Sequence, residues 1–496
     1  MPLIHDMDRQ AAVDLLHRLV TVGVEFKLDD QVTRKRLTPQ DIRDLLVTEL
    51  PEQSTGVHDV AQELVDVVLP LCNNEASPRF LGFGHTGADV SALAAGLLAL
   101  FAQQNLINQS FAAPSATFTE IAVIRWLRDL IGYPNLPVNE VRTVWDVGGV
   151  TTYGGTGSNT TAMLLARENI APGTMHTGVA NAERMHIVVP AGIGHYSVKS
   201  ALEWIGCGGR IIEVPTRGYR YDLHQLEKTL TERRDEIMSV VAYTGDSRTH
   251  TVENLRAVHD IARAVRPEIW LHADACWGLM CAFTPELAGK LDGITAFDSV
   301  TVDPHKVMDI PYAMSALLVR DPASLRLVSS YSDLIMQEDF AFGQVTPFIG
   351  TKEWSSVKLW AMMRAHGRAG LAEMMQRRLI TTRTFSGLVD DNPRLLRLNN
   401  PDMTAVVFVY LPTGHDPQRP DVDRINDVSH RIHARLLEEG RWHFHQFSIP
   451  DDTGRISQGA TLRPLRFMGN NGRITEGHMR DALAYVTGLG RAMENA

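Results

Sequence analysis

Short runs rich in Val and Ile alternate with longer runs of helical spacing between about residues 76 and 375. The strand-like runs include MHIVVP (185–190), RIIEVP (210–215), SVVAYTG (239–245) and IWLHADA (269–275). Strands that alternate with helices form βαβ units, which predict an α/β fold with a mostly parallel sheet. Ligands of such sheets bind beyond the carboxyl ends of the strands. We therefore expect a functional site along one edge of the sheet.

The two flanking regions have different patterns. Residues 1–75 alternate apolar and charged positions at helical spacing, with a helix start at Thr38-Pro39 and a stop at Pro51. This pattern predicts a helical arm with little core of its own, which packs on another domain or on a partner subunit. Residues 376–496 read as helix, strand, helix, two strands and helix, which predicts a small α+β domain. Residues 76–375 form the large domain of this interpretation.

Composition excludes several classes of protein. The formal net charge of -10 argues against a general nucleic-acid surface. The four cysteines form no CxxC pair, so we expect neither a disulfide framework nor a zinc site, and a reducing, cytoplasmic setting fits best. The N-terminus has no apolar core of a signal peptide. The longest apolar run, Val90–Ala102, is too short to span a bilayer, so we interpret it as a buried helix and expect no membrane partner.

The stretch SVTVDPHK places Lys306 just after a strand-like run. A desolvated ammonium tends to lose its proton, and a lysine with a lowered pKa attacks aldehydes, as in Schiff-base chemistry with pyridoxal phosphate (PLP). On these eight residues alone, a surface lysine explains the pattern equally well.

Three other stretches carry candidate chemistry. In YGGTGSN (153–159), glycines before a helix allow close approach of an anion, and Thr156 and Ser158 add hydroxyl donors; a tight turn is the alternative. Asp274 follows a strand and could pair with a protonated pyridine nitrogen, or it could be a structural residue, either a helix N-cap or a strand-end Asp. His195 opens a helix, and its imidazole could stack on a planar cofactor or be structural. His443 and His445 share a strand face, and without a third ligand we predict no metal site.

Together and in this order, these motifs resemble the group II PLP-dependent amino-acid decarboxylases, which include the glutamate, aromatic amino-acid and histidine decarboxylases. The similarity runs from about Pro78 to about Gly367 and includes SPRFLGF and SVKLWAMMRAHG. It implies the fold-type I PLP fold and a homodimer with active sites at the subunit interface. It also implies decarboxylation of an L-amino acid to its amine through a Schiff base and a quinonoid.

The resemblance implies a role for each matching residue. Lys306 would hold PLP as a Schiff base, Asp274 would pair with the ring nitrogen, and His195 would stack on the ring. Further cofactor contacts are expected from Gly155, Thr156, Ser158, Asp303 and His305.

This sequence departs from the family pattern at three places. Residues 245–250, GDSRTH, replace a GTT-type turn, which could alter substrate recognition or form an internal Asp–Arg pair in a surface turn. The stretch 350–354 lacks the family's usual arginine pair. In the loop after the lysine, where relatives carry a proton-donating tyrosine, Phe340 or Phe342 aligns roughly and Tyr331 comes early. A phenyl ring cannot donate a proton, so an aldehyde-forming oxidative reaction is the alternative outcome.

The substrate is less constrained than the cofactor. Phe80, Phe83 and His85 are candidates to line its pocket and favour an apolar or aromatic side chain over a dicarboxylate. A catalytically silent scaffold subunit is the third hypothesis, and the intact set of Lys306, Asp274 and His195 argues against it.

Overall fold

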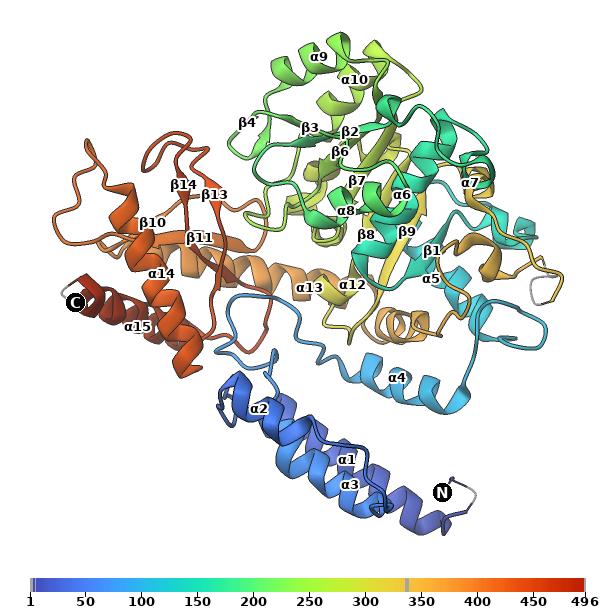
Figure 1. Ribbon diagram of the computed structural model, residues 1–496, viewed down its shortest axis with the longest axis horizontal. Coiled ribbons are helices and arrows are strands. Elements are labelled where there is room, and N and C mark those ends of the chain that lie inside the picture. The colour runs from blue at the N-terminus through green and yellow to red at the C-terminus, as the bar shows by residue number, and fades with distance from the viewer. Residues whose placement is uncertain (1–2, 5, 335–338, 495–496) are drawn as a thin grey trace.

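A seven-stranded sheet forms the centre of the protein, for which the computed structural model describes residues 3–4, 6–334 and 339–494 (Figure 1). The strand order is β1-β9-β8-β7-β6-β2-β3. The pairs β3–β2, β2–β6, β6–β7 and β7–β8 are parallel, and β9 runs antiparallel to both of its neighbours. The predicted α/β class with a mostly parallel sheet is confirmed. The strands are β1 (Gly149–Thr152), β2 (His186–Pro190), β3 (Ile211–Val214), β6 (Ile237–Tyr243), β7 (Trp270–Ala275), β8 (Ser299–Val302) and β9 (Ser315–Val319), with a separate hairpin of β4 (Thr216–Arg217) and β5 (Arg220–Tyr221).

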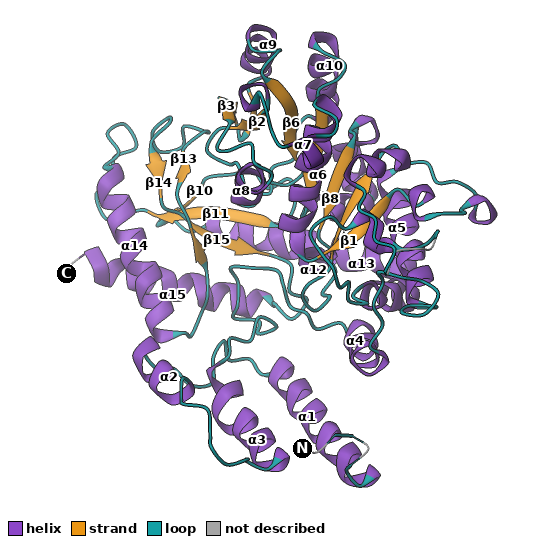
Figure 2. Cartoon of the chain, turned by 45° about the vertical axis from the view of Figure 1, so that its right-hand side comes forward, coloured by secondary structure: helices purple, strands orange, loops and turns teal. Residues whose placement is uncertain are grey.

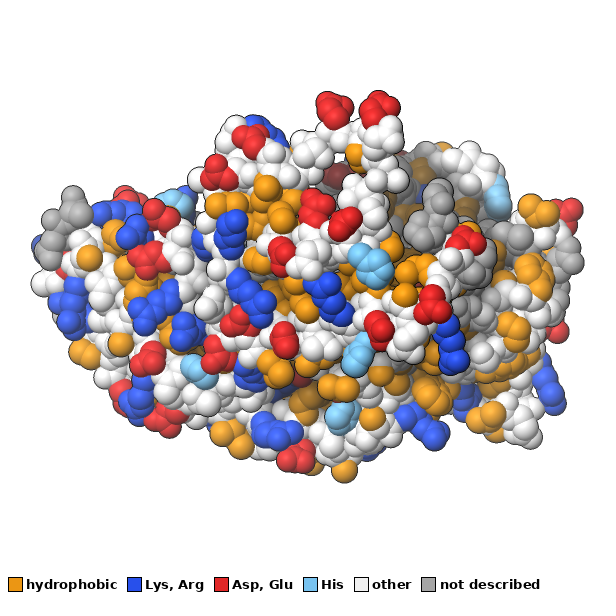
Figure 3. Space-filling view, turned by 90° about the horizontal axis from the view of Figure 1, so that it is seen from below, with side chains coloured by type: hydrophobic (Ala, Val, Ile, Leu, Met, Phe, Trp, Pro, Cys, Tyr) orange, Lys and Arg blue, Asp and Glu red, His pale blue; other side chains and the backbone are white. Residues whose placement is uncertain are grey.

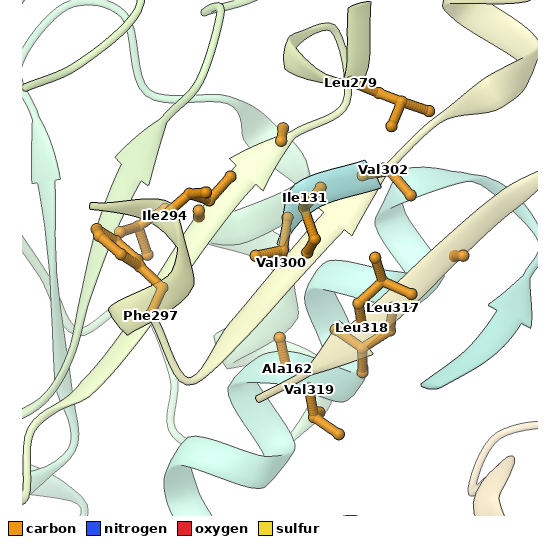
Figure 4. Packing of buried hydrophobic residues seen from close by; sticks show 14 of the residues in the cluster. Ile131, Ala162, Leu279, Ile294, Phe297, Val300, Val302, Leu317, Leu318 and Val319 are labelled. Carbon is orange, nitrogen blue, oxygen red and sulfur yellow. The ribbon is translucent and has the colours of Figure 1, made fainter. Parts of the chain in front are cut away.

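The central strands are buried on both faces, which explains their nearly continuous apolar sequences. Figure 4 shows Val300 and Val302 of β8 beside Leu317 and Leu318 of β9, with Ala162 of a covering helix close by. Burying an aliphatic side chain of this size stabilises the fold by about 1.5–3 kcal/mol. The sheet is therefore a rigid base for the loops at its carboxyl edge.

Helix α6 (Gly154–Ile170) is the central covering helix, because it contacts β1, β6, β7, β8 and β9. Helix α8 packs beside α6, and α5 packs against β1 and β9. The other helices of this region are α4 (Val90–Ala102), α5 (Ala116–Ile131), α7 (Thr174–Thr177), α8 (Tyr196–Trp204), α9 (Leu223–Glu232), α10 (Leu255–Val265), α11 (Pro285–Ala288) and α12 (Pro304–Val307).

The N-terminal arm consists of α1 (Arg9–Leu28), α2 (Pro39–Leu46) and α3 (Val57–Glu63), which lie below the sheet in Figure 1. The predicted helix start is confirmed, since Thr38 and Asp41 form a capping box with Pro39 in the first turn. One side of α1 leaves apolar side chains exposed, namely Val13, Leu16, Val20 and Val24.

The prediction that Val90–Ala102 is a buried helix is only half right. The segment is α4, but Leu98 and Phe101 are 59% and 61% exposed, and only Ala92 and Ala95 are buried. The helix is apolar on every side, whereas this chain covers only the side that packs on α13. From below, the space-filling view shows apolar side chains scattered among charged ones across the lower face (Figure 3). Within the described residues, none of the helices combines the length and apolarity needed to cross a membrane.

The C-terminal region forms a second, antiparallel sheet of order β10-β11-β15-β12 (Figure 2). Stacked Phe385 and Phe467, with ring centroids 3.8 Å apart, lie in its core. Sequence analysis missed β10, which has only three residues. The elements are α13 (Ser356–Asp390), β10 (Leu395–Arg397), β11 (Ala405–Tyr410), α14 (Val422–Glu439), β12 (His445–Gln446), β13 (Ile449–Pro450), β14 (Thr461–Leu462), β15 (Leu465–Met468) and α15 (Glu476–Glu494).

Helix α13 spans the expected domain boundary at residue 375. Its backbone leaves helical geometry at Gly367, where φ is 61°, a value that favours glycine. We retain the division into 1–75, 76–375 and 376–496 as a proposal.

Candidate active site

Lys306 lies in the single turn of α12, just past the end of β8. Its Nζ is 2.7 Å from Asp303 Oδ2 and 5.5 Å from the ring centroid of Trp277. Burial is the largest single influence and lowers the pKa of Lys306, but the charges around Lys306 and its hydrogen bond to Asp303, with Asp303 the main contributor, together outweigh burial, so the pKa is raised. The prediction of a lowered lysine pKa is therefore wrong for the chain by itself. The reason is Asp303, three residues earlier. The octapeptide contains this residue but does not reveal that its carboxylate is buried against Lys306.

Asp303 is fully buried between α12 and the start of α6. Burial would raise its pKa, but Lys306 and His305 lower it to about 2. The contact with α6 is close, because a Cβ added at Gly155 would lie 2.8 Å from Asp303 Oδ2 and 2.7 Å from Cys276 Sγ. Only glycine fits at position 155, so the backbone of α6 directly approaches the turn α12 that carries Lys306, which we call the lysine turn.

The glycine-rich stretch forms the first turns of α6. The prediction of a loop before the helix is wrong by several residues, since α6 begins at Gly154, whose φ of 79° lets the chain turn sharply from β1 into the helix. The N–H groups at a helix N-terminus form an anion site. Ser158 Oγ is buried and lies 2.6 Å from Thr152 Oγ1. The phosphate contacts of Gly155, Thr156 and Ser158 stay predictions.

Asp274 lies at the end of β7, with both carboxylate oxygens hydrogen-bonded. Its Oδ1 accepts from the backbone N–H of Cys276 at 3.2 Å, and its Oδ2 accepts from Asn159 Nδ2 at 3.0 Å. Of the two structural alternatives, the helix N-cap is wrong, because the partners of Asp274 are the N–H of Cys276 and the side chain of Asn159 on α6, whereas the strand-end position is what the structure shows.

His195 is the N-cap of α8, as the sequence predicted. Its ring Nδ1 accepts from the backbone N–H of Ser197 at 3.2 Å, and the backbone N–H of His195 donates to Tyr243 Oη at 2.9 Å. Burial lowers the pKa of His195, and Asp274 partly offsets this. The charges of Lys306, Asp303 and Asp274 all act on His195, so the structure brings these four predicted residues to one place.

The remaining predicted cofactor residue, His305, lies next to Lys306 and is buried. Its Nδ1 donates to Met314 O at 2.8 Å, and burial lowers its pKa. Among the described residues, no group of three or more His, Cys, Asp or Glu side chains is placed to hold a metal ion.

The candidate substrate residues Phe83 and His85 lie close to the lysine turn. The His85 ring is 5.4 Å from Trp277 and 5.9 Å from His305, and burial lowers its pKa. Phe80 is buried and stacks on His443 at 4.3 Å. Their contacts with substrate stay predictions.

Arg466, which comes from β15 in the C-terminal sheet, was not predicted from the sequence. Its guanidinium donates to Ser247 O and to Gly82 O at 2.9 Å, and it lies over the Phe83 ring at 5.0 Å. Burial lowers the pKa of Arg466 to about 9. A charged residue inside the apolar strand PLRFM was the available signal.

The GDSRTH turn does not contain the internal Asp–Arg pair that the sequence left open. Asp246 is buried and binds the turn's own backbone, accepting from the N–H groups of Arg248 at 2.7 Å and Thr249 at 2.9 Å. Among the residues that the structure describes, no carboxylate pairs with Arg248, and its buried Nε has no hydrogen-bond partner. Its charge acts on His195 and His445 instead.

The three loop candidates occupy different environments. Phe342 is fully buried in a 3-10 turn (Phe342–Val345), Phe340 packs on Phe118 with ring centroids 5.5 Å apart, and Tyr331 is 74% exposed. Residues 335–338 of the same loop lie outside the described residues. The identity of the proton donor stays a prediction.

Lys352 lies in the stretch 350–354, where the resemblance led us to expect an arginine pair, and its side chain is buried. Its Nζ is 3.3 Å from Glu120 Oε1 and donates to Thr151 O at 2.7 Å. The next residue, Glu353, donates its N–H to Tyr153 Oη at 2.8 Å. This segment therefore braces β1 and the residue that precedes α6.

Comparison with known proteins gives consistent matches. A family profile described as the pyridoxal-dependent decarboxylase conserved domain matches residues 39–411. Acidic amino acid decarboxylase GADL1 of Xenopus tropicalis is 24% identical over 457 residues, covering 88% of this chain and 86% of that protein. L-2,4-diaminobutyrate decarboxylase of Acinetobacter baumannii is 25% identical over 427 residues, covering 81% and 79%. The crystal structure of Oryza sativa TDC with PLP and tryptamine has a TM-score of 0.85 at 20% identity, covering 98% of this chain and 99% of that one. This last likeness confirms the fold-type I architecture.

Proposed function

Since the chain belongs to the pyridoxal-dependent decarboxylase family and is a PLP-dependent carboxy-lyase, we propose that it converts an L-amino acid to the corresponding amine. The observation that supports this proposal is the meeting of Lys306, Asp274, His195 and the N-terminus of α6 at one edge of the sheet. The donor set fits the cofactor: a lysine for the aldehyde, a carboxylate for the pyridine nitrogen, and helix N–H groups for the phosphate. Bound PLP supplies the electron sink that accepts the electron pair left by the departing carboxylate.

The chain's own residues would bind the cofactor, orient it and stabilise its charges. Lys306 would bind PLP covalently and give way to the substrate amine. Asp303, whose pKa of about 2 keeps it ionised, would hold positive charge at Nζ. Asp274 would keep the ring nitrogen protonated, and His195 would lie against the ring.

Two arginine side chains add positive charge on the side of Lys306 where Phe83 and His85 lie. We call this the substrate side. Arg248 has no carboxylate partner among the described residues, and the guanidinium of Arg466 is buried close to the Gly82 backbone. The α-carboxylate of an amino acid is the anionic group that such charges attract.

The second candidate outcome is an aldehyde rather than an amine. It is favoured by the rough alignment of Phe340 or Phe342 with the loop position where a proton-donating tyrosine is expected. Without a proton donor at that position, the electron pair held by the bound cofactor would be available to oxygen, which would be reduced to peroxide.

Product analysis separates these outcomes. The purified, PLP-loaded protein is incubated in air with a panel of L-amino acids, and the products are identified by mass spectrometry. An amine lighter than its parent by one carbon dioxide supports the decarboxylase proposal and names the substrate. An aldehyde with peroxide supports the oxidative alternative. A full panel without product, with PLP bound to Lys306, contradicts both.

We also propose that two copies associate and that the enzyme works in the cytoplasm, where its four free cysteines stay reduced. The exposed apolar side chains of α1 and α4 support association, because such faces are normally covered. The double change Leu98→Glu and Phe101→Glu is expected to shift the mass measured by light scattering from two chains to one. Leu437→Glu, at an exposed leucine of α14, is the matched control.

A further inference from the structure

A branched network of hydrogen bonds lies beneath Asp274 and ends at His195. It joins Trp270, Ser299 and His272, three side chains of β7 and β8, to Asn159 of α6. From Asn159 one branch reaches Asp274, and the other passes through Ser197 to His195. We propose that Asn159 is a positioning residue that, through this network, holds His195 as the neutral imidazole with its proton on Nε2.

The orientation of the Asn159 amide is determined by Asp274. An ionised carboxylate only accepts hydrogen bonds, so Asn159 must present its NH2 group to Asp274 Oδ2, 3.0 Å away. The amide oxygen then faces the other way, 3.0 Å from His272 Nε2. The Asp274 carboxylate therefore determines which atom donates and which accepts in each hydrogen bond of the network connected to Asn159.

The branch through His272 agrees with this orientation. Asn159 Oδ1 needs a donor, so His272 carries its proton on Nε2. Burial lowers the pKa of His272 to about 4, so the ring is neutral and its Nδ1 accepts from the Ser299 hydroxyl at 2.8 Å. Ser299 Oγ in turn accepts from Trp270 Nε1 at 2.8 Å. The indole only donates, so no step of this branch has two donors or two acceptors facing each other.

The branch to His195 follows from the second N–H of the amide. Asn159 Nδ2 donates to Ser197 Oγ at 2.9 Å, which leaves the Ser197 hydroxyl hydrogen free to point at His195 Nδ1, 2.6 Å away. The backbone N–H of Ser197 also donates to His195 Nδ1 at 3.2 Å. Two donors converge on one ring nitrogen, so the single proton of the neutral ring is on Nε2.

This arrangement makes Nδ1 of His195 unavailable as a base. A proton there would face two hydrogens and would require the Ser197 hydroxyl to turn away. The charged groups facing the ring are mixed: Asp274 and Asp303 favour the imidazolium, and Lys306 and Arg248 disfavour it. The network decides which nitrogen carries the proton, and it leaves Nε2–H as the donor that the ring can offer to a bound group.

The ring nitrogens of His195 can be observed directly. Nitrogen-15 spectra of histidine-labelled, PLP-loaded protein distinguish Nε2–H, Nδ1–H and the imidazolium, and His195→Gln identifies the signal. We expect Nε2–H across neutral pH. Asn159→Asp is nearly isosteric but replaces the donor with an acceptor beside Asp274, so it should raise the pKa of His195 and weaken PLP binding by about tenfold or more.

Asn169→Asp is the matched control, since Asn169 lies on the same helix and its amide donates to Glu268 O at the surface. It should leave the ring signal and the PLP affinity unchanged. Ser197→Ala removes only the hydroxyl and keeps the N–H donor, so it tests the branch if Asn159→Asp does not fold; it should raise the Nδ1–H or imidazolium fraction.

Three results would overturn the proposal. The first is an Nδ1–H signal in the unmodified protein. The second is a His195 signal in Asn159→Asp that matches that of Asn169→Asp. The third is a folded Ser197→Ala variant whose ring titrates as in the unmodified protein. None of these readouts depends on knowing the substrate, so a failed search for product leaves them intact.

Discussion

The network around Asp274 and the region around Gly82 and β15, which lie on the two sides of Lys306, differ in how completely their buried polar atoms are hydrogen-bonded. On the Asp274 side, Asn159, His272 and Ser299 all have partners in one consistent network. On the side formed by the Gly82 turn and β15, the buried ring nitrogen His85 Nε2 and the guanidinium nitrogen Arg248 Nε have no partner among the described residues. Buried polar groups without partners cost free energy, whereas satisfied networks make a site rigid. We infer that the first side is preorganised for the cofactor and that the second keeps hydrogen-bonding capacity for the substrate.

The largest expected effect comes from the residue between the two sides. Lys306→Ala should abolish the visible absorbance of the Schiff base and lower turnover by at least roughly a thousandfold, as expected when a covalent nucleophile is removed. Absorbance spectra after PLP addition and product assays check this. Lys228→Ala, on the exposed face of α9, is the control. A Schiff-base absorbance band that persists in Lys306→Ala would show that PLP is not bound through Lys306.

Beside β1, the strand that leads into α6, Lys352→Met should be strongly destabilising. It leaves the buried Glu120 carboxylate without its cation, and breaking a buried pair in this way costs about 3–5 kcal/mol. Urea unfolding measures the loss. Adding Glu120→Gln should recover part of it, because Gln removes the unpaired charge and still accepts from Thr151. Equal stability of the single and double variants would contradict the assignment.

On the substrate side, His443 should make the fold acid-sensitive. Burial lowers its pKa from 6.5 to about 4. Above pH 6.5 neither the folded nor the unfolded chain binds the proton, and between 6.5 and 4 only the unfolded chain does. Stability therefore falls as the pH drops through this window, by about 3 kcal/mol in total, and then levels off.

His443→Phe keeps the stack on Phe80 and removes the titrating group. The variant should lose less stability than the unmodified protein between pH 6.5 and 4 in unfolding experiments. His224→Gln, at an exposed position, should leave the pH profile unchanged. Parallel profiles for all three proteins would show that His443 is not buried in neutral form.

The smallest expected effect is on substrate binding. Arg248→Met should raise the KM for the amino acid by about tenfold, the equivalent of 1.4 kcal/mol, because it removes a positive charge from the substrate side. PLP affinity should be unchanged. Arg234→Met removes an exposed arginine and is the control. A change in PLP affinity with an unchanged KM would show that Arg248 acts on the cofactor and not on the substrate.

The residues that were predictable from sequence share a local signal. Lys306 and Asp274 each follow a strand, and His195 opens the helix after one, so the βαβ pattern already placed them at the same edge of the sheet. Arg466 could not be placed in this way, because its closeness to Gly82 depends on how the C-terminal sheet, which contains β15, packs against a segment far away in the sequence. The same limit applies to α4, whose exposure depends on what the rest of the chain leaves uncovered. The charge of Lys306 was misjudged because it depends on the orientation of Asp303.

Gly155 restricts which amino-acid substitutions this sequence can accept during evolution. A methyl group there would meet both Cys276 Sγ and Asp303 Oδ2 at less than 3.0 Å, so three positions widely separated along the chain cannot change independently. A lineage that acquires alanine at 155 must first shrink residue 276 and displace the carboxylate that neutralises Lys306. That route passes through a protein with a disturbed lysine turn. Selection on the chemistry therefore acts on a glycine that has no functional group.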